Sequence, residues 1–200
     1  LVRALLARER SVRALIHHDR RGIEGLDVEV FQGDVCDPAS LERACAGIEV
    51  VYHTAVRIAL SGNDRVEAIN VGGTRNVVEA CLRAGVRRLI HFSSIHALEQ
   101  KPLDQPLDED RAYVDPARAA PYDRSKAAAE GEVQAPGHGS LRVEGLDRGP
   151  PYAIASGASR RGRALHAHPR PVSAMVSSRN RASGQGSVPG NSSRRIERSR

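Results

Sequence analysis

Two residues with complementary acid–base chemistry, Tyr122 and Lys126, stand four positions apart in the segment PYDRSKAAAE. Residues at this spacing lie on the same face of a helix. A phenol is a weak base near neutral pH because its reference pKa is about 10, and a neighbouring ammonium group favours the phenolate. The spacing predicts a pair in which the phenol exchanges a proton with an alcohol or a carbonyl group. The alternative is a surface tyrosine beside a solvated lysine.

Three further polar residues occupy positions at which ligands are often bound. Ser93 and Ser94 follow the apolar segment RLIHF, at the carboxyl end of an expected strand, where open α/β sheets gather their ligands. Their hydroxyls would hold a substrate oxygen, or they simply cap the strand end. Asn70 enters a helical segment and is interpreted either as a helix cap or as part of the same site.

The segments that would position these side chains alternate between the helical and the strand period. Strands are expected at residues 11–17, 28–31, 49–55 and 88–94, and helices at residues 1–10, 37–46, 66–84 and from 122 onward. Asp37 followed by Pro38 is typical of a helix start, and Gly85 of a helix end. Short connections between alternating elements predict right-handed βαβ units. The expected fold class is α/β, with a doubly wound parallel sheet of the Rossmann type.

The composition of the chain changes after residue 98. Residues 99–121 are rich in Pro and Asp and are expected to form a long surface loop that borders the site. Beyond residue 135, Arg, Ser, Gly and Pro supply 38 of the 65 residues, and neither period persists. We therefore divide the chain into an α/β domain, residues 1–135, and a disordered or non-native tail, residues 136–200.

The charge balance separates the same two regions. The chain carries a net charge of +6, but residues 1–135 hold 18 basic against 21 acidic residues and the tail holds 12 against 3. The tail contains neither Phe nor Trp for base stacking, so no specific nucleic-acid binding is expected. No apolar run reaches the ~18–20 residues of a membrane helix. The three cysteines predict no metal site or disulfide framework and suggest a reducing, cytoplasmic location.

The order of three motifs, EVVYHTA, AINVGGTRNVVEACLRAGVRRLIHFSS and PYDRSK, resembles the extended short-chain dehydrogenase/reductases. These include NAD-dependent epimerase/dehydratases, dihydroflavonol 4-reductases and 3β-hydroxysteroid dehydrogenases, and the resemblance covers residues 1–134. It implies an NAD(P)-dependent oxidoreductase that acts on a secondary alcohol or carbonyl of a small molecule, with the dihydroflavonol-reductase-like branch favoured. A sugar-nucleotide epimerase/dehydratase and a non-catalytic dinucleotide-sensing protein are the alternatives. Because relatives are frequently dimers, a homodimer is the assembly that the resemblance implies.

The resemblance also implies a role for each site residue. Tyr122 would be the catalytic acid/base with Lys126 as its partner, Ser94 rather than Ser93 would bind the reacting oxygen, and Asn70 would support the lysine through water. At the cofactor, contacts are implied from strand ends and from the catalytic helix: His17, Asp34, Val35, His53, Thr54, Ala55, Tyr122 and Lys126.

The implied cofactor is NADP or NAD. His17 stands where the family meets the adenosine ribose, and the arginines that follow it favour NADP slightly. The family's first strand and its glycine-rich phosphate turn precede the position of Leu1, so residues 1–135 are expected to be a partial NAD(P)-binding domain. This chain is therefore expected to bind the cofactor weakly and to be inactive as a fragment.

Overall fold

The strands of the described residues form one parallel sheet. The computed structural model describes residues 1–58, 65–108, 110–135, 139, 141–144 and 172–175. The sheet has six strands in the order β2-β1-β6-β3-β4-β5, and every neighbouring pair is parallel. The strands are β1 (Val12–Ile16), β2 (Glu29–Gln32), β3 (Val50–His53), β4 (Arg88–His91), β5 (Arg142–Glu144) and β6 (Val172–Met175).

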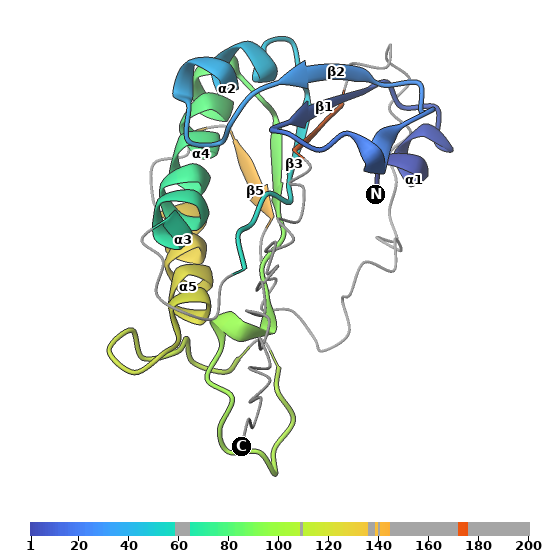
Figure 1. The fold of residues 1–200 in the computed structure, drawn as a ribbon. Coiled ribbons are helices and arrows are strands. Elements are labelled where there is room, and N and C mark those ends of the chain that lie inside the picture. Colours follow the sequence, from blue (N-terminus) through green and yellow to red (C-terminus); the bar gives the residue numbers. More distant parts are fainter. Residues whose placement is uncertain (59–64, 109, 136–138, 140, 145–171, 176–200) are drawn as a thin grey trace, which may run out of the picture.

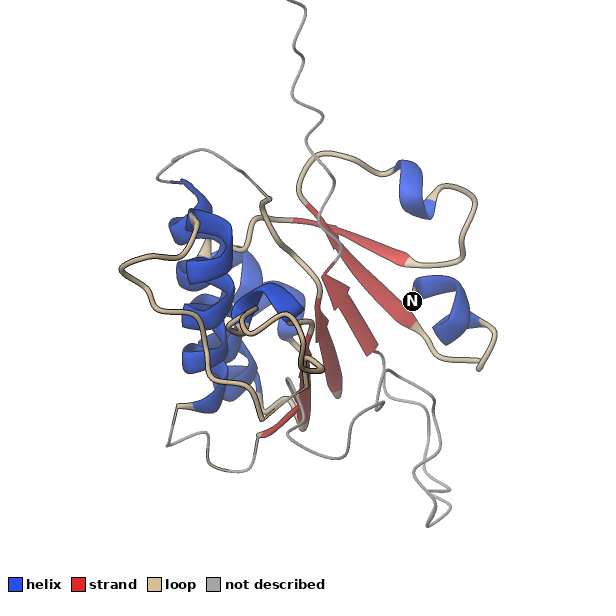
Figure 2. Ribbon diagram, turned by 90° about the horizontal axis from the view of Figure 1, so that it is seen from below, coloured by secondary structure: helices blue, strands red, loops and turns tan. Residues whose placement is uncertain are grey.

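Helices cover the two faces of this sheet unequally (Figures 1 and 2). One face carries α2 (Pro38–Cys45), α4 (Gly73–Ala84) and α5 (Pro121–Gln134), which we call the helical layer. The other face carries α1 (Val2–Leu6), which packs against β1. The remaining helical turns are η1 (Arg21–Ile23), α3 (Arg65–Glu67), η2 (Ala68–Gly72) and η3 (Ile95–Ala97).

Local signals explain where the helices of the layer begin and end. The Asp37 side chain accepts a hydrogen bond from the Ala39 amide, which caps α2 as the Asp-Pro pair predicts. Gly85 ends α4 with a φ of 66°, in the left-handed region that favours glycine. A Cβ atom at Gly73 would lie 2.8 Å from a methyl group of Val35, so only glycine lets α4 approach so closely.

The structure divides the helix predicted at 66–84, and the difference lies in its first half. The π-helical turn η2, Ala68–Gly72, separates α3 from α4 and contains Asn70. A π-turn widens the helix by one residue and is frequent at functional sites. Here it accompanies the burial of Asn70, which is 3% exposed, so Asn70 is neither an N-cap nor a surface residue.

The predicted tail differs from the structure in two short segments. The sequence suggested no regular structure beyond residue 135, yet β5 extends the sheet beside β4, and β6 lies between β1 and β3. A four-residue strand such as β6 holds too few alternations of apolar and polar residues to be recognised in a segment rich in Arg, Ser, Gly and Pro. Its backbone pairs with the facing edges of β1 and β3, whose peptide groups need hydrogen-bond partners. Most of the tail lies outside the described residues, so the boundary at residue 135 stays a prediction.

The other predicted elements are present with slightly different bounds. The first helix ends at Leu6 rather than at residue 10, and β3 and β4 end at His53 and His91 before their predicted limits. The alternating order of strands and helices confirms the predicted doubly wound α/β fold class. Within the described part of the chain, no helix combines the length and the apolar character that a membrane crossing requires.

Candidate active site

The predicted site residues gather at one edge of the sheet because its strands are parallel. His17, Asp34, Thr54 and Ser93 each follow the carboxyl end of a strand, β1, β2, β3 and β4 respectively. Carboxyl ends of parallel strands meet at a common edge, and α/β sheets bind their ligands there. The amino-terminal half of α5 packs against η3, which follows β4, so α5 brings Tyr122 and Lys126 to this edge.

Lys126 is anchored inside the molecule. Its side chain is 4% exposed, and Nζ donates a hydrogen bond to the backbone carbonyl of Phe92 at 2.8 Å. Burial lowers the pKa of Lys126 to about 8, and the opposite charge of Glu130 counteracts part of that lowering. The amine therefore remains largely protonated at neutral pH and ties α5 to the end of β4.

Tyr122 lies near the start of α5, one helical turn before Lys126. Pro121 occupies the first turn of the helix, where a missing amide hydrogen has no consequence. The ring of Tyr122 is half-buried and meets the His96 ring edge-on, with 5.7 Å between the centroids. His96 Nδ1 in turn lies 3.1 Å from the Asp123 carboxylate, so η3 and the first turn of α5 hold the phenol between them.

Asn70 links α5 to the segment that follows β3. Its amide oxygen accepts a hydrogen bond from the Arg57 amide at 2.8 Å, and its amide nitrogen donates to the Arg57 carbonyl at 2.9 Å. The same nitrogen donates to Ser125 Oγ at 2.9 Å, and Ser125 Oγ donates to the Tyr122 carbonyl at 2.7 Å. Asn70 thus reaches α5 through Ser125, whereas the resemblance implied a link to Lys126 through water.

The two serines after β4 differ in their contacts. Ser94 Oγ accepts a hydrogen bond from the His96 amide at 3.2 Å and caps η3, which leaves its hydroxyl hydrogen free to point at a substrate oxygen. Ser93 Oγ is buried and has no hydrogen-bond partner among the described residues. Both hydroxyls therefore retain hydrogen-bonding capacity, so the preference for Ser94 stays a prediction.

His53, predicted to line the cofactor, turns its ring into the helical layer. It is 1% exposed, and Nε2 lies 2.9 Å from Thr74 Oγ1. The Thr74 hydroxyl donates its one hydrogen to the Asn70 carbonyl, so His53 must carry its proton on Nε2. Burial and, to a lesser degree, the Lys126 charge lower the pKa of His53 to about 3, which keeps the imidazole neutral.

At the β1 and β2 ends the predicted residues form a separate group. His17 Nε2 lies 3.2 Å from Asp34 Oδ2, and the His17 and His18 rings are tilted by 39° with their centroids 3.6 Å apart. Asp34 Oδ1 also accepts a hydrogen bond from the Cys36 amide at 2.9 Å. Val35 is buried in the core. Its contribution to a cofactor site would come from packing, since its carbonyl already accepts a hydrogen bond from Asn76.

Thr54 and Ala55 occupy the edge directly after β3, as the sequence indicates. Ala55 is partly buried against the core cluster under the helical layer. Their position at the strand end is compatible with the predicted cofactor contact, which stays a prediction.

Sequence reasoning missed four buried polar residues near the predicted site residues: Thr74, His91, Ser125 and Glu130. His91 pairs with His53 in the register of β3 and β4, and the two ring centroids are 5.3 Å apart. Burial lowers the pKa of His91 to about 2, with smaller contributions from His53 and Lys126. Glu130 stands four residues after Lys126, and this repeat of the Tyr122 to Lys126 spacing is the signal that would have indicated it.

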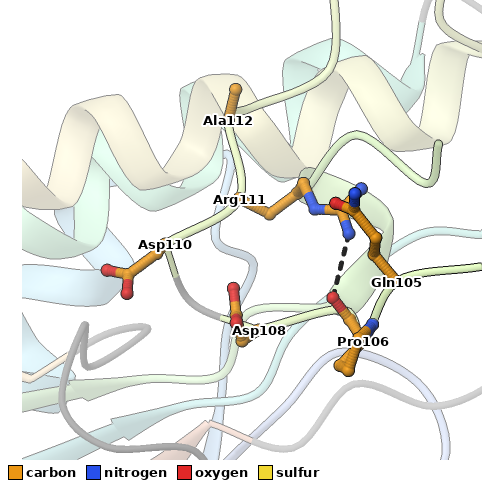
Figure 3. A pocket seen from close by; sticks show the side chains of 6 residues that line it. All are labelled: Gln105, Pro106, Asp108, Asp110, Arg111 and Ala112. Atoms are coloured by element: carbon orange, nitrogen blue, oxygen red, sulfur yellow. Dashed lines mark hydrogen bonds between the residues drawn. The ribbon is translucent and has the colours of Figure 1, made fainter. Parts of the chain in front are cut away.

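The predicted loop at 99–121 carries a shallow hollow of its own (Figure 3). Arg111 crosses it and donates a hydrogen bond to the Pro106 carbonyl at 2.9 Å, marked by the dashed line in the figure. The base of the loop is closed by an antiparallel bridge between Leu98 and Tyr113. None of the residues that line the hollow belongs to the predicted site, so the hollow adds nothing to it.

A sequence model of the 3-beta hydroxysteroid dehydrogenase/isomerase family matches residues 1–143. Sterol demethylase protein B of Methylococcus capsulatus is 41% identical over 66% of this chain and 42% of its own length. The 3 beta-hydroxysteroid dehydrogenase type 7 of Rattus norvegicus is 34% identical over 78% of this chain and 51% of its own length. The chain therefore spans about half the length of these relatives.

Two solved structures show the same arrangement of strands and helices. A short-chain dehydrogenase/reductase superfamily protein from Agrobacterium tumefaciens with bound NAD matches with a TM-score of 0.62 and 29% identity, over 72% of this chain and 43% of that chain. The UDP-glucose 4-epimerase of Thermus thermophilus in complex with NAD matches with a TM-score of 0.57 and 28% identity, over 64% of this chain and 43% of that chain.

Proposed function

Because this chain belongs to the 3-beta hydroxysteroid dehydrogenase/isomerase family, we propose that it is part of an NAD(P)-dependent oxidoreductase that interconverts a secondary alcohol and a ketone on an apolar small molecule. The observation that carries the proposal is the buried Lys126, one helical turn from Tyr122 and bonded to the strand end that Ser93 and Ser94 follow. This arrangement supplies a proton donor, a positive charge and hydroxyls for one reacting oxygen.

The described residues fit the two ends of a nicotinamide cofactor. The strand ends near Lys126 offer the unpartnered Ser93 hydroxyl, and the end of β2 offers the Asp34 carboxylate, where the ribose or base of adenosine would lie. Within the described ranges, no glycine-rich turn faces the pyrophosphate between these ends. The choice between NAD and NADP depends on His17 and its neighbours, and NADP stays the slightly favoured cofactor.

In the proposed reaction, a bound nicotinamide would supply or accept the hydride. Tyr122 Oη gives its proton to the carbonyl oxygen during reduction or takes the proton of the alcohol during oxidation. The Lys126 charge stabilises the negative charge that develops on that phenol oxygen, and the Ser94 hydroxyl holds the substrate oxygen in place. Asn70 and Ser125 keep the first turn of α5 in register with the end of β3.

Apolar side chains beside the site favour an apolar substrate. Phe92 and Ile95 flank the serine pair and are 47% and 62% exposed, and Ile58, after β3, is 62% exposed. A ring system with a secondary alcohol, such as a sterol or a dihydroflavonol, would cover these side chains. The dihydroflavonol therefore remains one of the two candidate substrate classes. A sugar nucleotide would bring its charged diphosphate to the same region, so we rank the epimerase alternative lower.

Because this chain alone is expected to be inactive, the test uses a full-length form in which the family's first strand and glycine-rich turn precede Leu1. It compares turnover of three substrate classes: a 3β-hydroxysteroid, a dihydroflavonol and UDP-glucose, each followed through the absorbance of the reduced nicotinamide or, for UDP-glucose, through the epimer formed. Tyr122→Phe should reduce turnover by about 100-fold or more, because it removes the acid/base. Tyr52→Phe is the matched control, since Tyr52 packs against the cluster on the opposite face of the sheet.

Three results would contradict the proposal. Equal turnover by wild type and Tyr122→Phe would indicate a non-catalytic, dinucleotide-sensing protein, and activity restricted to UDP-glucose would indicate an epimerase. Absence of both turnover and saturation transfer to NADH and NADPH in NMR, measured on the full-length form, would contradict cofactor use.

A further inference from the structure

A carboxylate lies fully inside the helical layer, one turn beyond the catalytic lysine. Glu130 is 0% exposed, and Lys126, four residues earlier on α5, is 4% exposed. Moving a charged group out of water into a packed interior is strongly unfavourable unless an opposite charge or several hydrogen bonds compensate. The burial of both groups on one side of one helix therefore requires an explanation.

Hydrogen bonds alone do not account for the burial of Glu130. Oε2 accepts a long hydrogen bond from Gln134 at 3.3 Å, and Oε1 has no partner among the described residues. Oε1 lies 3.9 Å from His91 Nε2, which is beyond hydrogen-bond range. An ionised carboxylate usually accepts several hydrogen bonds, so an ionised Glu130 would need compensation from a nearby positive charge.

The histidines beside Glu130 do not supply that charge. Burial lowers the pKa of His91 on β4 to about 2 and that of His53 on β3 to about 3, so both rings are neutral at neutral pH. On adjoining elements, Arg75 of α4 pairs with Glu132, and the His96 ring of η3 lies against the Asp123 carboxylate. Lys126, buried on the same helix one turn before Glu130, is the positive group that we consider as its partner.

We propose that Glu130 is a positioning residue that acts through Lys126: its carboxylate holds the buried amine in the ammonium form and on the side of α5 that faces Phe92. The role of this ammonium in proton transfer rests on the proposed function, but the charge pairing itself does not. In agreement, Glu130 is the group that raises the pKa of Lys126 against the larger opposing effect of burial. Tyr122 lies one helical turn before Lys126 on α5, and Glu130 lies one turn after it.

The chain offers a direct measurement, because Lys101 and Lys126 are its only two lysines. Chain labelled with ¹³C at the lysine ε-carbon gives two signals whose pH titration reports both pKa values without cofactor or turnover. In Glu130→Gln the pKa of Lys126 should fall by about 1 from its wild-type value, since a nearby opposite charge has been removed. The exposed Lys101 should titrate identically in both proteins and serves as the internal control.

Glu132→Gln is the matched control variant, because Glu132 lies on the same helix and pairs with Arg75 rather than with Lys126. It should leave the pKa of Lys126 unchanged. An unchanged Lys126 titration in Glu130→Gln, or an equal fall in Glu132→Gln, would overturn the proposal.

If Glu130→Gln fails to fold, Glu130→Asp tests the same point. Aspartate keeps the charge but withdraws it by one methylene group, so the pKa of Lys126 should fall by a smaller amount, and an unchanged value would overturn the pairing. Loss of turnover in Glu130→Gln with an unchanged Lys126 titration would separate a failure of this proposal from a failure of the proposed function, which concerns Tyr122.

Discussion

The face of the sheet under the helical layer buries ionisable and polar side chains together with apolar ones, whereas the face under α1 buries apolar side chains. Among the described residues, the buried polar groups either lie on the elements of the helical side or, like His53 and His91, point from the strands toward them. The opposite face has a smaller cluster around Val2, Leu5 and Ile23 against β1. Farther along that face, Phe92 is 47% exposed.

This difference shows where the molecule can alter the chemistry of its side chains. A large pKa shift requires that water be excluded, and only the helical side excludes it from Lys126, His53 and His91. Tight packing and site chemistry therefore share one face. On the other face, apolar side chains of the strands are partly exposed and offer a surface for contact with other molecules.

The largest difference between the two faces is expected in the free energy of unfolding when adjacent residues of β4 are replaced. Leu89 points into the helical layer with 0% exposure, whereas Ile90 points to the other face and is half-buried. Leu89→Ala should lower the free energy of unfolding by about 3 kcal/mol, because it leaves a cavity in a packed core. Ile90→Ala should lower it by about 1 kcal/mol or less. Urea unfolding followed by circular dichroism measures both, and equal losses would refute the difference between the faces.

The pH dependence of stability is the next largest effect. Burial places the folded-state pKa of His53 at about 3 and that of His91 at about 2, below the value of about 6.5 for an unfolded histidine. Between these values the unfolded chain binds more protons, so the free energy of unfolding falls as pH decreases below about 6.5, by up to about 1.4 kcal/mol per pH unit for each ring. From about pH 7 to about pH 5.5 we expect a loss of about 2 kcal/mol in urea unfolding.

A pair of variants assigns this pH effect to the buried rings. His91→Leu should reduce the loss between the two pH values by about half, since one of the two rings no longer titrates. His18→Leu removes an exposed histidine and should leave the loss unchanged. The same pH dependence in His91→Leu and in wild type would mean that folding does not lower the pKa of His91.

The predictability of the fold from sequence depended on the length of each periodic segment. The helix ending at Gly85 and the strand around RLIHF were predicted because each carries several turns or alternations of apolar residues. The π-turn around Asn70 was not, because one inserted residue hardly disturbs a helical period. The strand β6 was not, because its place in the sheet is set by pairing with β1 and β3, which are distant in sequence.

The candidate site was predictable where two residues share one helix, as Tyr122 and Lys126 do. It was not predictable where residues meet across elements. The segment RLIHFSS reads as one apolar run, and only the packing of β4 against α5 brings His91 within 3.9 Å of Glu130. The inward turn of His53 depends likewise on the partner Thr74 from α4.

The hydrogen bonds of Asn70 provide a smaller test of the helical side. Asn70→Ala should lower the free energy of unfolding by about 1–2 kcal/mol, because it leaves the Arg57 peptide and Ser125 without their partner. Asn76→Ala, which removes one hydrogen bond to the Val35 carbonyl, should lower it by less. Amide hydrogen exchange at Arg57 should accelerate in Asn70→Ala alone, and slow exchange there in both variants would show that Asn70 does not hold the end of β3.

The smallest effect concerns the N-termini of the helices on the two faces of the sheet. Asp37 caps α2 on the helical side, whereas α1 on the other face begins without a side-chain cap. Asp37→Ala should therefore lower the free energy of unfolding by about 1 kcal/mol, and Asp37→Asn, which keeps an acceptor oxygen, should change it little. If both substitutions destabilised the protein equally, the contribution would come from the negative charge at the helix terminus rather than from the hydrogen bond to the Ala39 amide. Because α2 packs on α4, a weakened cap should also raise hydrogen exchange in α2 before it affects α1, which shares no core cluster with it.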